Sequence, residues 1–359
     1  MSTSSPLLTP FRAGALNLRN RIVMAPLTRG RADPVTHVPT PMMLDHYAQR
    51  ATAGLIITEG CMIAPDTCTY YGMPGVYSTE QLLAWRTITD AVHARGGAIV
   101  CQIWHPGRAT HASLNEAADI MGPSAVAAEG VLHTPMGKQP FPTPREMTLD
   151  DIANATRLYA TAAANCVNIA GFDGVEVHAA NGFLIDQFLR DGANQRNDAY
   201  GGSFENRSRF LVEVVTAVGA AIGRDRVGVH AAPFNGYFGQ SDSRPWDFVR
   251  HLAATLNDLE VAFVLLLRRD LTGVVPGDAT AAFRAAYRGV LIGNQGYDEA
   301  EASATVGSSA LDAVAFGAPF IANPDLVARI EKGICWAISN PATYYTQGVE
   351  GYNDYPIAA

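Results

Sequence analysis

The stretch DGVEVHAAN, residues 173–181, joins a strand pattern to two polar groups at its end. Its short apolar core follows Asp and Gly, as strands often do, and it runs into His178 and Asn181. Seven other short runs rich in Val, Ile, Leu or Ala have a similar form. They are RIVMAPL (21–27), GLIITEG (54–60), AIVCQIW (98–104), VGVHAA (227–232), VAFVLLL (261–267), GVLIG (289–293) and DAVAF (312–316). Apolar residues at helical spacing lie between the runs, at 79–95, 149–167, 203–222 and 248–260.

Eight strand-like runs that alternate with helices predict a parallel sheet, and closing eight such units gives a (β/α)8 TIM barrel. An open doubly wound sheet is the alternative, but no G-x-G-x-x-G follows the first run, which favours the barrel. We expect one barrel domain over residues 1–359. Residues 109–147 break the alternation and are rich in Pro, Gly and Ala, so we expect a capping insertion after the third strand.

Composition and charge narrow the class of protein. Hydrophobic residues make up 48% of the chain and charged residues 17%, which is typical of a folded protein with a large core. The net charge is −8 and no Lys/Arg run occurs, so we expect neither nucleic acid nor an anionic membrane as partner. The five cysteines form no C-x-x-C pair, and no signal peptide or apolar span is evident, which predicts a cytoplasmic protein. The spacing of His105 and His111 does not suggest zinc, and no metal is expected.

Polar residues gather where the predicted strands end. The active site of a TIM barrel lies at the C-terminal ends of its strands. Gln102, His178, Asn181 and His230 all lie at such ends, and we therefore expect them to converge on one small-molecule site.

Several segments resemble the Old Yellow Enzyme family, in order and over nearly the whole chain. They are NRIVMAPLTRGR (20–31), YAQRATAGLIITEG (47–60), QIWHPGR (102–108), GFDGVEVHAANGFLIDQFLRDGANQRNDAYGGSFENRSRF (171–210), DAVAFGAPFIANPDL (312–326) and TYYTQGVEGYNDYP (343–356). The resemblance implies a barrel that binds FMN, takes hydride from NAD(P)H and passes it to the β-carbon of an α,β-unsaturated carbonyl. It also leaves a homodimer open, because family members are often dimers.

The resemblance assigns roles to individual residues. His178 and Asn181 match the pair that hydrogen-bonds the substrate carbonyl oxygen, and two fixed donors at one oxygen would stabilise an enolate-like charge. The other matched positions contact the flavin ring (Pro26, Thr28, Gly60, Gln102), wall the substrate pocket (Tyr70, Trp104, Tyr345) or form framework (Arg21, Arg29, residues 206–209). If FMN binds, backbone amides near Gly296 and Gly317 would have to hold its phosphate.

Four residues depart from the family pattern. Phe183 stands where the family has a Tyr that protonates the α-carbon, and Phe has no proton to give. His230 replaces an Arg whose permanent charge lies beside the flavin. Gln295 replaces a Gly in the loop after strand seven, and Ala318 replaces an Arg that grips the phosphate. The lost phosphate contact is worth roughly 1.5–3 kcal/mol for each hydrogen bond to a charged group.

These losses fall on the flavin site and spare the carbonyl-binding pair. The first hypothesis is therefore a barrel that has lost its flavin and works as a non-redox isomerase or cyclase on a carbonyl compound. His178 and Asn181 would form its oxyanion hole, and His230 would donate or act as base. Arg268 and Arg269 could hold a substrate carboxylate or could equally belong to a solvated turn. The second hypothesis is an FMN-dependent NAD(P)H ene reductase, or a flavin-dependent isomerase. The third is a binding protein without catalysis.

Overall fold

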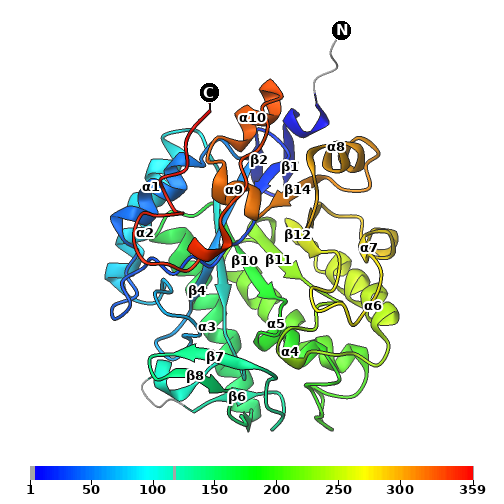
Figure 1. The fold of residues 1–359 in the computed structure, drawn as a ribbon. Helices are drawn as coiled ribbons and strands as arrows, with labels where there is room; N and C mark the ends of the chain where they lie inside the picture. Colours follow the sequence, from blue (N-terminus) through cyan, green and yellow to red (C-terminus); the bar gives the residue numbers. More distant parts are fainter. Residues whose placement is uncertain (1–4, 116–118, 359) are drawn as a thin grey trace.

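Eight parallel strands close into a barrel in the computed structural model, which describes residues 5–115 and 119–358 (Figure 1). The strands follow one another around the barrel in chain order, so each is hydrogen-bonded to the next. They are β3 (Ile22–Met24), β4 (Leu55–Met62), β5 (Ile99–Trp104), β10 (Gly174–Ala179), β11 (Val227–Ala231), β12 (Phe263–Leu267), β13 (Leu291–Asn294) and β14 (Ala313–Phe316). Each lies within or overlaps one predicted run, so the (β/α)8 barrel is confirmed and the open sheet was the wrong alternative.

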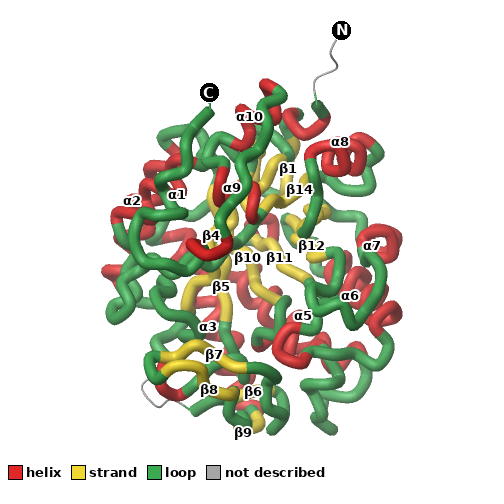
Figure 2. The backbone as a smooth tube through the Cα atoms, viewed as in Figure 1, coloured by secondary structure: helices red, strands yellow, loops and turns green. Residues whose placement is uncertain are grey.

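Helices surround the barrel (Figure 2). The α-helices are α1 (Pro41–Gln49), α2 (Thr79–His93), α3 (Leu149–Asn168), α4 (Leu184–Leu189), α5 (Phe204–Ile222), α6 (Pro245–Asp258), α7 (Thr280–Ala286), α8 (Glu299–Gly307), α9 (Ala318–Ala322) and α10 (Leu326–Lys332). The short 3-10 helices are η1 (Pro6–Leu8), η2 (Ala112–Leu114), η3 (Arg224–Arg226), η4 (Tyr237–Gly239) and η5 (Pro341–Thr343). Within the described residues, no helix combines the length and apolarity needed to cross a membrane.

Local sequence sets the ends of the longer helices. α2 begins with a capping box, in which the Ser78 hydroxyl accepts from the Gln81 amide and the Gln81 side chain accepts from the Ser78 amide. Thr148 and Asp151 form the same arrangement at the start of α3. These caps satisfy backbone donors that the first helical turn leaves unpaired. They explain why both helices begin close to the predicted residues.

The barrel is closed at its bottom, the end where its strands begin, and open at its top, the end where they finish. Its central strands are buried along their whole length, as parallel strands with helices outside are. A hairpin of β1 (Phe11–Ala13) and β2 (Leu16–Leu18) packs into the end where strands begin, because Ala13 and Leu16 join Phe263 and Ala313 in one buried cluster. The open end therefore lies at the C-terminal ends of the strands.

The predicted insertion lies between β5 and α3. It carries the short strands β6 (Met121–Gly122), β7 (Val131–Thr134), β8 (Gly137–Pro140) and β9 (Arg145–Glu146). β7 and β8 form an antiparallel hairpin beside the barrel (Figure 1). Residues 116–118 of the predicted insertion lie outside the described part of the chain. The division into one domain over residues 1–359 stays a prediction.

Candidate active site

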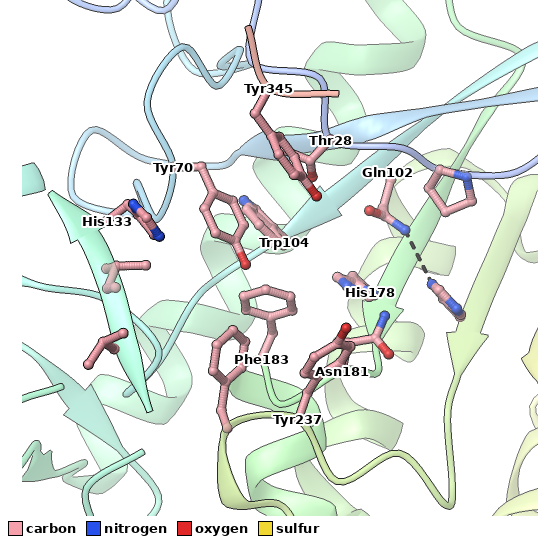
Figure 3. A pocket seen from close by; sticks show the side chains of 15 residues that line it. Thr28, Tyr70, Gln102, Trp104, His133, His178, Asn181, Phe183, Tyr237 and Tyr345 are labelled. Atoms are coloured by element: carbon pink, nitrogen blue, oxygen red, sulfur yellow. Dashed lines mark hydrogen bonds between the residues drawn. The ribbon is translucent and has the colours of Figure 1, made fainter. Parts of the chain in front are cut away.

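A cavity of about 620 Å³ opens at the C-terminal ends of the barrel strands. It brings together most of the residues that the sequence marked as a site (Figure 3). The predicted residues in its lining are Pro26, Thr28, Tyr70, Gln102, Trp104, His178, Asn181, Phe183, His230 and Tyr345.

Some predicted residues lie elsewhere. Gly60 does not line the cavity. A Cβ atom at this position would come within 3.0 Å of the Trp104 ring, so a larger residue would displace that ring. Gly296 lies in the loop after β13, and Gly317 and Ala318 lie where β14 passes into α9, all three outside the cavity lining. Among the described residues, the backbone amides of these three make no hydrogen bond. This leaves donors at the barrel end where phosphates commonly bind.

Arg268 and Arg269 do not face the cavity. The Arg268 guanidinium stacks on the Tyr297 ring at 3.7 Å and pairs with Glu301, with 3.0 Å between Nη2 and Oε2. Arg269 pairs with Asp278 at 3.7 Å. The suggestion that this pair holds a substrate carboxylate in the same site was therefore wrong, because ion pairs with Glu301 and Asp278 hold both side chains away from the cavity. Arg269 is exposed, as in the alternative of a solvated turn.

Five further residues line the cavity that were not predicted from the sequence. Val131, Leu132 and His133 come from β7, and Tyr237 and Phe238 come from η4 in the loop after β11. The insertion was expected to cap the site, but nothing in its sequence distinguishes β7 from the rest of it. The aromatic pair in PFNGYFGQ (233–240) was the available signal, since loops after barrel strands supply site residues.

The aromatic lining forms one connected wall. Trp104 contacts Phe183 with 4.1 Å between ring centroids, and Tyr70 lies 5.9 Å from Trp104. Tyr345 comes from the C-terminal segment, which is held in place by arginines after β3. Arg29 donates to the carbonyl oxygens of Tyr344 and Gly351, which supports its predicted role as framework.

His178 presents an unpaired neutral imidazole. Its ring stacks on that of His230 at 4.9 Å between centroids and 23° between planes. Neither of its ring nitrogens has a hydrogen-bond partner among the described residues, and Nδ1 is fully buried. Burial, and then the neighbouring His230, hold the pKa of His178 well below its usual range. A buried polar group without a partner is uncommon and suggests that a ligand completes the site.

Asn181 lies beside His178 in a left-handed backbone conformation, with φ of 58°. Asparagine is among the few residues that adopt this conformation readily. Its side-chain oxygen Oδ1 accepts a hydrogen bond from Nδ2 of Asn235 at 2.7 Å. Its own Nδ2 has no partner among the described residues, so the N–H2 group is free to donate.

Gln102, Glu176 and His230 form a polar network inside the barrel. Nε2 of Gln102 donates to Oε2 of Glu176 at 2.7 Å and lies 3.4 Å from Nδ1 of His230. Since an amide N–H2 group only donates, Nδ1 of His230 must accept, and its proton sits on Nε2. That Nε2 is buried without a partner, and burial lowers the pKa of His230 to about 3.

Replacing Glu176 should change how stability depends on pH. Burial raises the pKa of Glu176 to about 8, while the Gln102 hydrogen bond lowers it in part. In the unfolded chain a Glu titrates near about 4.3, so the unfolded state binds fewer protons between these values and stability falls as pH rises. We expect Glu176→Gln, which cannot ionise, to melt a few degrees higher than the parent at pH 8, with the smallest difference near pH 4.

Thermal unfolding from pH 4 to pH 9 measures this effect. Glu331→Gln, at an exposed carboxylate, controls for the loss of one negative charge. A Glu176→Gln curve that parallels the parent across the whole range would show that this carboxyl does not titrate as its burial requires.

Comparison with known proteins identifies the family. Residues 6–336 match the model of the NADH:flavin oxidoreductase / NADH oxidase family. The chain is 47% identical to a probable flavin mononucleotide-dependent alkene reductase of Leishmania infantum, over 98% of this chain and 97% of that protein. It is 38% identical to the putative 12-oxophytodienoate reductase 11 of Oryza sativa subsp. japonica, over 99% of both. The old yellow enzyme of Trypanosoma cruzi superposes with a TM-score of 0.96 at 39% identity, covering 99% of both chains.

These matches overturn two expectations. The flavin-free, non-redox isomerase or cyclase was the wrong hypothesis, and so was the loss of the cofactor. The family model that matches is that of NADH:flavin oxidoreductases, and a relative that matches over the full length is a probable flavin mononucleotide-dependent alkene reductase. The physical reason is that the site still offers unpaired polar groups. Among the described residues, the backbone amides of Gly296, Gly317 and Ala318 make no hydrogen bond, and His178 and His230 each carry a buried ring nitrogen without a partner. The second hypothesis, an FMN-dependent reductase, is the better supported one. The chain belongs to the NADH:flavin oxidoreductase / NADH oxidase family, as an Old Yellow Enzyme homologue.

Proposed function

We propose that this protein is an FMN-dependent NAD(P)H ene reductase that acts on α,β-unsaturated carbonyl compounds. The observation that carries the proposal is the pair of unpartnered groups at one wall of the cavity, His178 and Asn181, which can both donate to one carbonyl oxygen. Full-length similarity to the alkene reductase of Leishmania infantum supports it.

The residues present fit FMN. Thr28, Gln102 and His230 line one side of the cavity, and the last of these carries a buried N–H without a partner, as the polar edge of a flavin ring would require. The free amides of Gly296, Gly317 and Ala318 would hold the phosphate through backbone N–H groups. FMN bound there would accept hydride from NAD(P)H and deliver it to the substrate.

The side chains of this protein would bind the substrate carbonyl, stabilise its developing charge and exclude water. Two donors on the carbonyl oxygen withdraw electron density from the conjugated double bond and stabilise the negative charge that develops on that oxygen. His178 is neutral, so it offers one N–H as a donor without adding charge to the site. Tyr70, Trp104 and Phe183 wall the cavity with aromatic rings, and these exclude water from the reacting carbons.

A visible spectrum of the purified protein tests the proposal. Bands near about 450 nm that survive gel filtration after addition of FMN, with NAD(P)H-dependent reduction of 2-cyclohexenone, are the expected result. A protein that does not bind FMN, or that binds FMN and reduces no enone, would contradict the proposal. A protein that only holds the enone without turnover would match the third hypothesis instead.

Phe183 favours a second function, flavin-dependent isomerisation. Its ring lies in the cavity wall at 4% exposure and carries no proton for the α-carbon. A slow supply of that proton would leave time for the added hydride to be taken back from another carbon. That return would shift the double bond without net reduction, whereas prompt protonation would complete the reduction. Incubation of an enone with the holoenzyme under limiting NAD(P)H would distinguish the two by the ratio of isomerised to reduced product.

Restoring a hydroxyl at this position should favour reduction. We expect Phe183→Tyr to raise the rate of enone reduction by about 10-fold to 10²-fold, at or below the lower end of what a positioned general acid contributes. The rate of enzyme reoxidation by enone, followed in stopped flow, measures this step alone. Phe238→Tyr is the matched control, since Phe238 lines the same cavity. Equal rates in the parent and Phe183→Tyr would mean that the proton already arrives as fast as the reaction needs it.

A further inference from the structure

We propose that Asn235 is a positioning residue that holds Asn181 with its N–H2 group toward the substrate. The inference rests on the proposed function, because it concerns how the carbonyl-binding pair is oriented. Asn235 is fully buried in the loop after β11 and does not line the cavity. It acts only through Asn181.

The orientation of Asn181 needs a cause. An Asn side chain has an acceptor at one end of its amide and a donor at the other, in nearly the same shape. If Oδ1 of Asn181 faced the cavity, it would repel a carbonyl oxygen instead of binding it. The backbone does not decide between the two orientations, because both share the left-handed turn that places Asn181 and Gly182 at φ of 58° and 80°.

Contacts of Asn235 remove this ambiguity. Oδ1 of Asn235 accepts from the backbone N–H of Leu271 at 3.4 Å, so its amide nitrogen must point the other way. That nitrogen donates to Oδ1 of Asn181 at 2.7 Å. Since the donor end of Asn235 meets the acceptor end of Asn181, the N–H2 group of Asn181 is left for the cavity.

The Leu271 N–H belongs to a loop that hydrogen bonds to Asp270 hold together. Asp270, at the start of the loop after β12, accepts from the backbone amides of Gly236, Thr272, Val274 and Val275 at 2.7–3.0 Å. One carboxylate therefore ties the loop after β12 to the residue that follows Asn235. This arrangement holds the Leu271 N–H where Asn235 needs it, and three loops together set one donor of the site.

Two substitutions at residue 235 test the inference. Asn235→Leu keeps a similar volume and removes both amide contacts. Asn235→Asp keeps the acceptor for Leu271 but presents oxygen to Oδ1 of Asn181, which should turn that amide around. The probe is 4-nitrophenol, whose ionised oxygen resembles the charge that two donors would stabilise. Its affinity for the holoenzyme is measured by calorimetry from pH 6 to 9, which gives the pKa of the bound phenol.

We expect both variants to bind the phenolate about 10-fold to 100-fold more weakly than the parent, in the range of one hydrogen bond to a charged group. The pKa of the bound phenol should rise toward its value in water. In the Asn181→Ala background, Asn235→Leu should cause no further loss, because the two residues act as one unit. A purely structural role would leave the bound pKa unchanged, and its effects would add to those of Asn181→Ala.

Controls separate this inference from the proposed function. Asn20→Leu removes another buried amide, at the bottom of the barrel, where Asn20 bonds Thr52 and Ile22, and should leave phenolate binding unchanged. A parent protein that binds neither FMN nor phenolate would overturn the proposed function itself. A parent that binds both, with Asn235→Asp binding the phenolate equally well at an unchanged melting temperature, would overturn only the role of Asn235.

Discussion

His178→Ala should lower kcat/KM for enone reduction by about 10²-fold to 10³-fold, the typical cost of removing one donor from an oxyanion-type site. The imidazole has no hydrogen-bond partner among the described residues, so its removal breaks no other hydrogen bond. Asn181→Ala should cost a similar factor. The double variant should lose less than the product of the two, because both donors serve the same oxygen.

Steady-state rates with 2-cyclohexenone measure these losses, and the flavin spectrum of each variant shows whether the cofactor site is intact. His93→Ala is a matched control, since His93 pairs with Asp173 on the surface, away from the cavity. If His178→Ala and Asn181→Ala kept nearly full activity with a normal spectrum, the substrate carbonyl would have to bind elsewhere. The proposed orientation of the substrate in the cavity would then be wrong.

The barrel was predictable because its strands carry a strong local signal. Strands such as β10 and β12 are buried on both faces, so they appear as short apolar runs between turn residues. Their closed parallel order then places residues far apart in the chain, such as Gln102 and His230, at one end. The part of the wall that Leu132 supplies was not predictable in the same way. Its position depends on how the insertion folds back over the barrel, and no local pattern encodes that.

The error about the cofactor has a different origin. The prediction that FMN is lost rested on single side chains, although the affinity for a ligand as large as FMN is a sum over many contacts. Backbone amides near Gly296 and Gly317 were expected to hold the phosphate, but the sequence alone could not show that these donors are free of other partners. His230 is a second position at which the residue type alone was not enough. The residue type alone suggested a lost charge, but only the contact with Gln102 shows that the histidine still presents an N–H.

Ala318 should limit how tightly FMN is held, and Ala318→Arg should lower the Kd of FMN by about 10-fold to 100-fold. The family has an Arg here, and a hydrogen bond to a charged group contributes roughly 1.5–3 kcal/mol. Ala318 is exposed at the start of α9, directly after Gly317, so an Arg side chain can reach past the free amides without displacing a packed neighbour.

Quenching of FMN fluorescence by protein freed of flavin gives the Kd, and the gain should shrink as salt rises because an ion pair is screened. Ala221→Arg adds the same charge at an exposed site at the far end of α5 and should leave the Kd unchanged. A similar gain in both variants would mean that net charge alone attracts FMN. No gain in either would mean that the phosphate does not lie at the loops after β13 and β14. The backbone amides there would then need another explanation, and the fit of FMN to this barrel would rest on the ring contacts alone.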